Sequence, residues 1–294
     1  MSRSASRVAF IGLGQMGLPM ARQLRNAGLN VVGYDQSVAA CELFSCDGGQ
    51  TAPSIAEAME GANFIVTMLP NGRIVQSALF SDSRNLEGVA PGALLLEMSS
   101  SAPAETRELA AKLPPGIGLV DAPVSGGVKR AIDGTLSIMA GGAQADLDDA
   151  TPILEHMAAK VFRCGPVGAG HAVKAINNFV SGAGVVAAVE AIRLAQAYGL
   201  DAEIVTDVLD ASSGKNNATE VKMKQFMLNG SFGSGFALGL MAKDIRTAAA
   251  LSDDLGLDQA CLKQTAEIWD AAAASLGGAV DHTRMFEFLR ESTD

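Results

Sequence analysis

The chain has 294 residues, 48% of them apolar, and a formal net charge of −10. This length allows two ordinary domains with cores of their own, and the acidic balance argues against a nucleic-acid partner, because binding to a phosphate backbone draws on clustered Lys and Arg. The cysteines are scattered, with neither the spacing of metal ligands nor a dense disulfide framework, so we expect no metal site and reduced thiols in the cytoplasm.

The most apolar helical stretch, residues 179–197, is interrupted by Glu190 and Arg193 and is rich in Gly and Ala. Such a stretch is too polar for the hydrocarbon core of a bilayer. The opening residues, MSRSASR, lack the apolar core and cleavage site of an export signal. We therefore expect a protein without membrane association, in which residues 179–197 form a buried helix.

The first half of the chain alternates short apolar runs with helical or turn-rich stretches. Between these runs, residues 16–27 and 103–112 carry apolar side chains at helical spacing, and Gly28 stands where the first of these helices should end. Alternation of this kind predicts a parallel sheet wound by helices, which is an α/β fold. The runs lie at residues 7–12, 30–35, 63–69, 93–98 and 117–121.

After about residue 165 the pattern changes to long helical periods rich in Ala, Leu and Val, with breaks near 212–217 and 230–235. We therefore predict a first domain over residues 1–165 and an all-helical second domain over residues 166–294. The break GSFGSGF at 230–236 is either a mobile element that closes on a ligand or a plain helix–helix loop with its phenylalanines in the core.

The first predicted strand runs into a glycine-rich turn. Gly12, Gly14 and Gly17 match G-x-G-x-x-G, a helix with Pro19 in its early turns follows, and Asp35 ends the next strand. In a dinucleotide-binding loop the first glycine permits the tight turn, the second lets backbone N–H groups approach the pyrophosphate, and the third lets the helix pack close to the sheet. The phosphates would sit at the helix N-terminus. The residues expected to contact the cofactor are Gly12, Leu13, Gly14, Gln15, Met16 and Gly17.

Asp35 bears on which nicotinamide cofactor is used. Its carboxylate would accept hydrogen bonds from the adenosine ribose hydroxyls and would repel a 2′-phosphate. Its neighbour is Gln36 rather than an arginine, so we expect NAD, with NADP possible. The competing interpretation is that Asp35 only forms a turn after its strand.

Three later loops carry polar residues. MLPNG at 68–72 and EMSSSAP at 97–103 end predicted strands at the edge where open α/β sheets bind ligands, so both are expected to face the cofactor unless they are ordinary loops. DAPVSGG at 121–127 offers the Ser125 hydroxyl and the N–H groups of Gly126 and Gly127 as a nest for a carboxylate. A bare hairpin turn is the alternative.

The segment GAGHAVKAINN at 168–178 places Lys174 and Asn178 four residues apart, on one face of a helix. Partial burial lowers a lysine pKa toward a useful range, so Lys174 is a candidate acid/base. A solvent-facing lysine with its stem packed on the helix is the competing interpretation. We expect His171 at the surface, or behind the residues that contact substrate.

Four motifs together resemble the β-hydroxyacid dehydrogenase family, which includes 3-hydroxyisobutyrate dehydrogenase and is related to 6-phosphogluconate dehydrogenase. They follow in the family's order: FIGLGQMGLPMA, DAPVSGGVKRAIDGTLSIMAGG, GAGHAVKAINN and AKDIRTA. The resemblance implies an N-terminal Rossmann-type doubly wound sheet, joined by a long helix to a C-terminal all-helical domain. It also implies a homodimer or homotetramer assembled through the helical domain.

The resemblance assigns roles to particular residues. Lys174 would be the catalytic residue, and Lys243 would reach toward the cofactor. Ser100 matches the family's hydroxyl on the nicotinamide side, with Ser99 as a one-residue alternative. Substrate would be held by Ser125, Gly126, Gly127 and Asn178, and the cofactor would be lined by Met68, Leu69 and Pro70.

The function implied is hydride transfer between NAD(P) and a short 3-hydroxy acid similar to 3-hydroxyisobutyrate, giving the semialdehyde, with Lys174 as general acid/base. Within the family, the alternatives are reduction of tartronate or succinic semialdehyde and oxidation of a sugar acid such as threonate. A non-catalytic sensor of nicotinamide redox state is a further alternative, but a sensor has no need of a lysine beside a carboxylate nest. Related imine reductases commonly lack this lysine.

Overall fold

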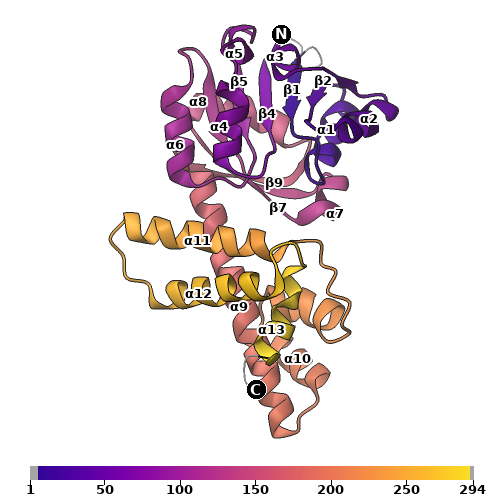
Figure 1. The fold of residues 1–294 in the computed structure, drawn as a ribbon, viewed down its shortest axis with the longest axis vertical. Coiled ribbons are helices and arrows are strands. Elements are labelled where there is room, and N and C mark those ends of the chain that lie inside the picture. The colour runs from indigo at the N-terminus through magenta and orange to yellow at the C-terminus, as the bar shows by residue number, and fades with distance from the viewer. Residues whose placement is uncertain (1–5, 292–294) are drawn as a thin grey trace. The chain divides into compact units, whose positions relative to one another are not determined.

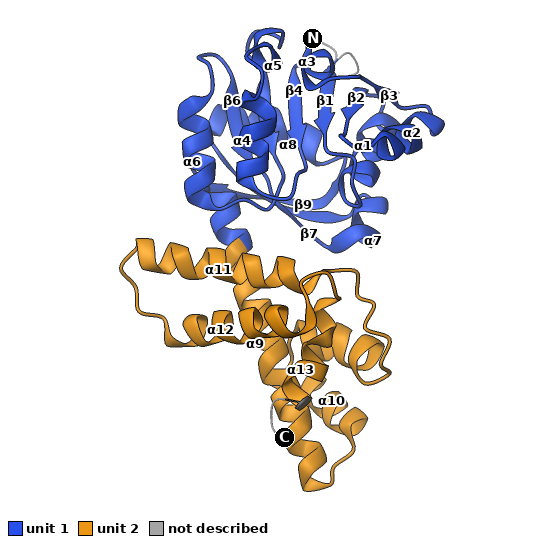
Figure 2. Cartoon of the chain, in the orientation of Figure 1, with its two compact units in different colours: residues 1–174 blue, residues 175–294 orange. Residues whose placement is uncertain are grey.

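The computed structural model describes residues 6–291 of the chain. The chain divides into two compact units, residues 1–174 and 175–294 (Figure 2). The sequence placed a boundary between residues 165 and 166, whereas the division between the units falls inside the long helix α9, Ala169–Tyr198. The start of α9 therefore belongs to the first unit and the rest of it to the second.

The first unit is built on a sheet whose order is β3-β2-β1-β4-β5-β6-β8-β7, with β9 paired to β8 (Figure 1). The first six strands of this order are parallel, whereas β8 runs antiparallel to β6 and β7. The bounds are β1 (Arg7–Ile11), β2 (Asn30–Tyr34), β3 (Gln50–Thr51), β4 (Phe64–Thr67), β5 (Leu94–Glu97), β6 (Gly118–Asp121), β7 (Val124–Ser125), β8 (Leu136–Gly142) and β9 (Ala158–Gly165). The predicted α/β fold with a doubly wound sheet is confirmed.

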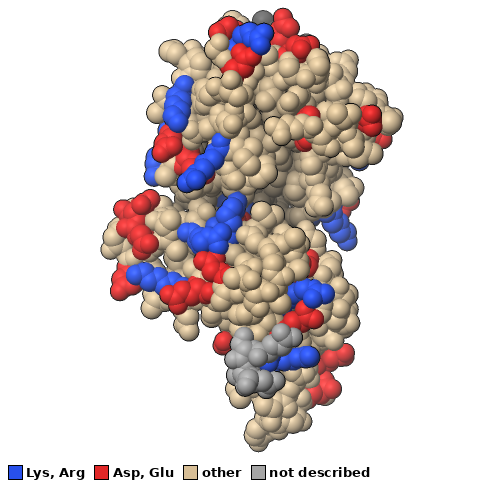
Figure 3. Space-filling model, in the orientation of Figure 1, with Lys and Arg blue, Asp and Glu red and all other residues tan. Residues whose placement is uncertain are grey.

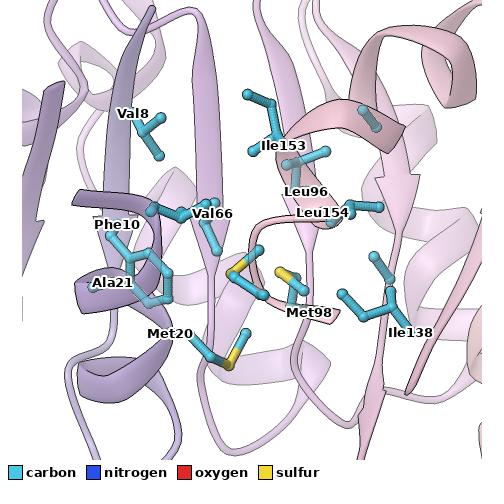
Figure 4. Close-up of a cluster of buried hydrophobic side chains, with 14 of the residues drawn as sticks. Val8, Phe10, Met20, Ala21, Val66, Leu96, Met98, Ile138, Ile153 and Leu154 are labelled. Atoms are coloured by element: carbon cyan, nitrogen blue, oxygen red, sulfur yellow. The ribbon is translucent and has the colours of Figure 1, made fainter. Parts of the chain in front are cut away.

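Helices cover both faces of this sheet because the buried strand residues alternate between two clusters. One cluster joins α1, α7 and α8 to one face, and Figure 4 shows part of it, with Phe10, Val66 and Leu96 between strands and helices. The other joins α3, α4, α5 and α6 to the opposite face. The bounds are α1 (Gly17–Asn26), α2 (Val38–Cys46), α3 (Ile55–Met59), α4 (Gly72–Phe80), α5 (Arg84–Glu87), α6 (Pro103–Lys112), α7 (Gly127–Ile132) and α8 (Gln144–Leu154).

The strand order reverses at β1, which pairs with β2 on one side and with β4 on the other. In open α/β sheets, ligands bind at the carboxyl ends of strands where the order reverses. The chain leaves β1 directly into the glycine turn and leaves β4 into the 68–72 loop. The glycine turn and the 68–72 loop, both predicted to face the cofactor, therefore leave the sheet where the strand order reverses.

The second unit contains the rest of α9 and the helices that follow it, around a core that includes Val189, Ile245 and Trp269. Gly182 on α9 lets α11 and α12 approach closely, since a Cβ there would press on Ile245 and on the Trp269 indole nitrogen. The bounds are α10 (Ala202–Asp210), the π-helix η2 (Ala218–Met227), α11 (Leu238–Asp254), α12 (Ala260–Leu276), the 3₁₀ helix η3 (His282–Arg284) and α13 (Met285–Glu291). The predicted helical second half is confirmed.

Helix α9 is the only described helix that is long and apolar enough to cross a membrane, judged by length and composition alone. Its side chains nevertheless form part of the core of the second unit, where Val185, Val189 and Ile192 are buried. The core helix of a soluble protein passes the same test of length and composition. The packing therefore agrees with the buried helix predicted for residues 179–197.

The GSFGSGF segment at 230–236 is held by Asp281, the residue that precedes η3. One Asp281 carboxylate oxygen accepts hydrogen bonds from the Gly235 N–H at 2.8 Å and the Ser234 hydroxyl at 3.0 Å. Phe232 and Phe236 pack against the core of the second unit. These contacts are the ones that the helix–helix loop interpretation predicts.

Candidate active site

The turn after β1 needs glycine at two positions for different reasons. Gly12 has a φ of +103°, and a Cβ there would overlap the Met68 carbonyl oxygen. A Cβ at Gly17 would overlap the Gly12 carbonyl oxygen, so only glycine lets α1 begin this close to the turn. Gly14, by contrast, is exposed and has open space around its missing side chain. The turn therefore leaves room on its outer side, at Gly14.

The start of α1 is arranged to attract an anion. Met16, which precedes the helix, makes no capping hydrogen bond through its side chain, and the first turn holds no acidic residue. The first N–H groups of α1 are thus not bonded to a capping side chain of Met16 or to an acidic side chain of the first turn. The helix dipole favours negative charge at this end. Gln15 and Gly14 are exposed beside it. These residues fit the pyrophosphate of a dinucleotide.

Asp35 connects the end of β2 to the glycine turn. Its Oδ2 accepts a hydrogen bond from the Leu13 N–H at 2.7 Å, and its Oδ1 accepts one from the Ser37 N–H at 2.8 Å. The Asp35 side chain therefore stabilises the turn after β2, which is the role that the turn-forming interpretation gives it. It also lies against the glycine turn, where the cofactor-binding interpretation places it. Each carboxylate oxygen has a second lone pair, so Asp35 retains acceptor capacity for ribose hydroxyls.

The 68–72 and 97–103 loops are bonded to each other through Ser99. This buried serine accepts a hydrogen bond from the Leu69 N–H at 3.0 Å, and its hydroxyl lies 3.4 Å from the Thr67 carbonyl. Ser100, next along the chain, is only partly buried. The Ser99 hydroxyl thus holds the two loops together.

Helices begin directly after both loops, for reasons that are local to the sequence. The Asn71 side chain accepts the Ile74 N–H at 3.0 Å and so caps α4. Pro103 opens α6, and Glu105 accepts the Ala102 N–H at 3.2 Å. Proline and a carboxylate are both favourable in the first turn of a helix. Met68, Leu69 and Pro70, which are partly buried or exposed, follow the end of β4 within this frame.

The 121–127 segment presents two consecutive glycines in the left-handed region. Gly126 has a φ of +134° and Gly127 a φ of +68°, and both are exposed at the start of α7. Residues other than glycine rarely adopt these backbone angles. Ser125, half-buried at the end of β7, precedes them. The hydroxyl and the two N–H groups proposed as a carboxylate nest are therefore neighbours on one short turn.

Asp121, at the end of β6, holds the beginning of α9. Its Oδ1 accepts the Gly168 N–H at 2.7 Å and its Oδ2 accepts the His171 N–H at 2.9 Å. Burial raises the pKa of Asp121, against the attraction of His171 and these two N–H bonds. The buried carboxylate thus ties the first turn of the helix that carries Lys174 to the sheet.

His171 is buried, so of the two positions expected for it, at the surface or behind the residues that contact substrate, the surface position is excluded. Its ring lies among groups from three other segments of the first unit: Glu97 at the end of β5, Asp121 at the end of β6, and Thr106 on α6. The Nε2 atom is 3.0 Å from Glu97 Oε2 and 3.1 Å from the Ser99 carbonyl oxygen. The carboxylates that end two neighbouring predicted strands were the signal that could have indicated this cluster.

The charges of this cluster support one another. Burial opposes ionisation of Glu97, but attraction and hydrogen bonding to His171 outweigh it and hold the pKa of Glu97 below its ordinary value. Burial likewise disfavours the charged form of His171, yet Glu97 and Asp121 raise the pKa of His171 above its ordinary value. The lowered pKa of Glu97 and the raised pKa of His171 are the shifts expected of an ion pair buried in the first unit.

Lys174 and Asn178 lie one turn apart on the continuous helix α9. Lys174 is half-buried, and Asn178 is buried in the second unit. The Asn178 Nδ2 donates to Asp244 Oδ2 at 2.6 Å, and the Lys243 Nζ lies 3.0 Å from Asp244 Oδ1. Sequence reasoning quoted Asp244 within AKDIRTA but gave it no role. In the structure, one oxygen of the buried Asp244 carboxylate binds Asn178 and the other lies beside Lys243.

Among the described residues, no group of three His, Cys, Asp or Glu side chains could hold a metal ion. Charged side chains of both signs are interspersed on the face shown in Figure 3, without a continuous basic patch.

Comparison with known proteins accounts for nearly the whole chain. A family model described as the NAD binding domain of 6-phosphogluconate dehydrogenase matches residues 7–165, and one described as NAD-binding of NADP-dependent 3-hydroxyisobutyrate dehydrogenase matches residues 168–289. The chain is 32% identical to 2-(hydroxymethyl)glutarate dehydrogenase of Eubacterium barkeri, over 98% of this chain and 96% of that one.

The chain is also 37% identical to NAD-dependent L-serine dehydrogenase of Pseudomonas aeruginosa, over 82% of this chain and 84% of that one. The solved structure of Mycobacterium tuberculosis 3-hydroxyisobutyrate dehydrogenase with L-serine superposes with a TM-score of 0.90 at 33% identity, covering 97% and 99% of the two chains. The resemblance noted from the four motifs is confirmed. This chain belongs to the β-hydroxyacid dehydrogenase family and is an NAD(P)-dependent oxidoreductase.

Proposed function

We propose that this enzyme transfers hydride between NAD(P) and a short 3-hydroxy acid, interconverting the acid and its semialdehyde. The observation that carries the proposal is the placement of Lys174 one turn before Asn178 on a helix whose first turn is fixed by Asp121. The relatives support the substrate class, since the L-serine in the Mycobacterium tuberculosis structure is itself a short 3-hydroxy acid.

The residues around the glycine turn fit the cofactor. Gly14 leaves open space for the pyrophosphate, the uncapped start of α1 faces it, and Asp35 offers its remaining lone pairs to the ribose. When bound, the nicotinamide supplies the hydride acceptor, or in reverse the donor. The Asp35 carboxylate disfavours a 2′-phosphate, which supports NAD as the preferred form. Met68, Leu69, Pro70, Ser100 and Lys243 are the further residues proposed to line the cofactor.

The substrate carboxylate would be bound by Ser125, the N–H groups of Gly126 and Gly127, and Asn178. The Gly126–Gly127 turn offers hydrogen-bond donors at no cost in reorganisation. Asn178 has its amide orientation fixed by Asp244, so its carbonyl and remaining N–H point in defined directions. Holding the carboxylate in this way would fix which carbon of the substrate is presented for hydride transfer.

Lys174 would move the proton. In oxidation, its neutral Nζ takes the hydroxyl proton as the C–H hydride leaves, and in reduction its ammonium returns a proton to the oxygen. An unperturbed lysine has a pKa of about 10.4. Oxidation should therefore quicken as pH rises through the titration of Lys174, and reduction should prefer lower pH. A flat oxidation profile between neutral and alkaline pH, with chemistry rate-limiting, contradicts this role.

The deciding experiment is a substrate panel. Purified enzyme is assayed by nicotinamide absorbance with short 3-hydroxy acids, sugar acids such as threonate, and tartronate or succinic semialdehyde, with NAD and NADP separately. The proposal expects the highest kcat/KM for a 3-hydroxy acid with NAD. Preference for a semialdehyde or a sugar acid would replace the substrate while keeping the chemistry. Lys174→Ala should bind NAD normally and lose at least about 100-fold in kcat; wild-type turnover by this variant would refute the mechanism.

We further propose that the enzyme works in the cytoplasm as a homodimer or homotetramer assembled through its second unit. The support is the apolar surface that this unit exposes on two consecutive helices, at Leu194 and Tyr198 on α9 and at Ile204 and Val208 on α10. Exposed apolar side chains one turn apart, as in each of these two pairs, can mark interaction sites in soluble proteins. The scattered spacing of the cysteines, which forms no dense disulfide framework, supports a reducing compartment.

A further inference from the structure

The buried histidine on α9 has only acceptors around its two ring nitrogens. On one side, Nε2 faces the Ser99 carbonyl oxygen at 3.1 Å and Glu97 Oε2 at 3.0 Å. A carbonyl oxygen cannot donate, and Glu97 already accepts the Ser99 N–H at 2.9 Å through its other oxygen, as an ionised carboxylate does. Nε2 of His171 must therefore carry a proton.

The other nitrogen is in the same situation. Nδ1 lies 2.8 Å from Thr106 Oγ1 and 3.4 Å from Asp121 Oδ2. The Thr106 hydroxyl has one proton and two acceptors in reach, Nδ1 itself and the Ala102 carbonyl at 3.1 Å; we assign the proton to the Ala102 carbonyl, the bond that a threonine inside a helix usually makes to the residue four positions earlier. Asp121 Oδ2 accepts the backbone N–H of His171. Thr106 and Asp121 are thus both acceptors toward Nδ1, so this nitrogen carries a proton as well.

We infer that His171 is a positioning residue that remains an imidazolium at neutral pH, holds the Ser99–Ser101 turn and the first turn of α9 in register, and offsets the buried carboxylates of Glu97 and Asp121 one helical turn from Lys174. The inference deepens the proposed function and rests on it where Lys174 is concerned. The ring itself is buried and makes no contact with solvent, so it acts through its neighbours.

The positioning role follows from what each partner carries. The Ser99 carbonyl belongs to the turn that also binds the Leu69 N–H, so the ring fixes both loops after β4 and β5. Asp121 caps α9 at Gly168 and His171, so the same ring fixes the helix on which Lys174 lies. One cation thus joins the cofactor-side loops to the helix of the proposed acid/base.

The electrostatic role concerns the basicity of Lys174. With His171 protonated, the cluster of Glu97, Asp121 and His171 carries a net charge of −1, and without that proton it carries −2. The charged groups facing the ring from its surrounding elements are these two carboxylates, while Arg107 on α6 lies further out at the surface, close to Gly168. Residues three apart on a helix are neighbours, so the extra negative charge would stabilise the Lys174 ammonium.

The first test reads the protonation state directly and needs no activity. The chain has three histidines, so ¹⁵N-histidine-labelled enzyme gives a small, assignable set of ring signals. His171, identified by its loss in His171→Gln, should show two protonated nitrogens at pH 7. Burial lowers the pKa of His282 to about 4, so its ring should be neutral and serve as the opposite reference. A neutral His171 ring at pH 7 overturns the inference.

The second test reads the effect on Lys174. In His171→Gln the glutamine can still donate one hydrogen bond but carries no charge, so the kinetic pKa for oxidation should rise by about 0.5–1.5 pH units. His156→Gln, an exposed histidine of the same unit, should leave it unchanged. The double variant His171→Gln/Glu97→Gln returns the cluster to −1 and should bring the kinetic pKa back toward the wild-type value.

A purely structural histidine gives a different pattern, in which His171→Gln lowers kcat equally at every pH and the double variant restores nothing. That pattern overturns the charge role while leaving the proposed function intact. Failure of the proposed function shows itself elsewhere, as wild-type turnover by Lys174→Ala. If His171→Gln does not fold, the ¹⁵N spectrum of the wild-type enzyme, assigned with Glu97→Gln and His156→Gln, still decides the protonation state.

Discussion

Gly14 and Gly17 belong to one motif, but their surroundings differ. A Cβ at Gly17 would overlap the Gly12 carbonyl oxygen, whereas nothing lies within 4 Å of a Cβ at Gly14. Gly17→Ala should therefore cost about 2–4 kcal/mol of unfolding free energy, as strain at a tightly packed turn does. Gly14→Ala should fold with stability within about 0.5 kcal/mol of wild type but bind NAD at least about tenfold more weakly.

Urea unfolding and NAD titration of the two variants check this pair, each serving as the other's control. Equal loss of stability in both would mean that the turn tolerates no side chain anywhere. Unchanged NAD affinity in Gly14→Ala would mean that the open space beside it is not where the pyrophosphate binds.

Asp35 sets the second prediction at this scale. Its carboxylate is held against the glycine turn by the Leu13 N–H, with exposed Gln36 next to it. Replacing both, as Asp35→Ser with Gln36→Arg, removes the negative charge and supplies a cation for a 2′-phosphate. The ratio of kcat/KM for NAD over NADP should fall by at least about 100-fold. Gln36→Arg alone is the control and should shift the ratio less, because the carboxylate remains.

The residues that sequence reasoning located best are those whose role is set by neighbours in the chain. The glycine turn and Asp35 could be placed because a strand, a turn and a helix follow one another locally. His171 could not, because Glu97, Thr106 and Asp121 reach it from segments that are distant in sequence. Asp244 was missed for the same reason, since its partner Asn178 lies on another helix.

At the scale of elements, the strands with continuous apolar runs were predicted almost to the residue, as at 30–35 for β2 (Asn30–Tyr34). The edge strand β9 (Ala158–Gly165) was missed because none of its residues is fully buried and their exposure shows no alternation. β8 (Leu136–Gly142) is mostly buried and apolar, but only a short turn separates it from α7 (Gly127–Ile132). The sequence motif 121–142 runs through both elements, so β8 was not recognised as a separate strand. Short buried runs are recognised only when their flanking turns are.

Helix α9 is anchored through groups whose pKa values differ from their ordinary ones, so its anchoring should depend on pH. The pKa of His171 is raised above 6.5 in the folded protein, mainly because Glu97 and Asp121 outweigh the effect of burial. A raised pKa means that its contribution to stability is complete below pH 6.5 and is lost as pH rises through the folded value. Glu97, whose pKa is lowered from 4.5, contributes above pH 4.5 and loses that contribution in acid.

Wild-type unfolding free energy should therefore fall relative to that of His171→Gln as pH rises above 6.5, at a rate of up to about 1.4 kcal/mol per pH unit. Urea denaturation between pH 5.5 and 8 measures the difference between the two proteins. The range ends at pH 8 because burial lowers the pKa of Lys222 to about 8, and its titration has the opposite sign. If the difference in unfolding free energy between the two proteins stays constant from pH 5.5 to 8, folding does not raise the pKa of His171, and the prediction is wrong.

At the scale of the whole molecule, the chain forms two units with separate cores. Among the described residues, the first core lies on both faces of a nine-stranded sheet and the second lies among helices. The second unit exposes large apolar side chains on successive turns of α9. Leu194 and Tyr198, one turn apart on α9, are 74% and 83% exposed. Neighbouring exposed apolar groups are typical of an interaction site, which supports the proposed assembly of the chain through this face.

Light scattering coupled to size exclusion should accordingly give the mass of a dimer or tetramer for the full chain. Leu194→Glu with Tyr198→Glu should shift it to monomer, because burying two carboxylates in an apolar interface costs several kcal/mol and weakens association by at least about 100-fold. Both positions are exposed in the single chain, so its thermal stability should otherwise be unchanged. The matched control is Leu43→Glu on α2 of the first unit, where Leu43 is 55% exposed; it should leave the mass unchanged. A monomeric wild type, or an assembly that survives the double variant, would exclude this face of α9 as the interface.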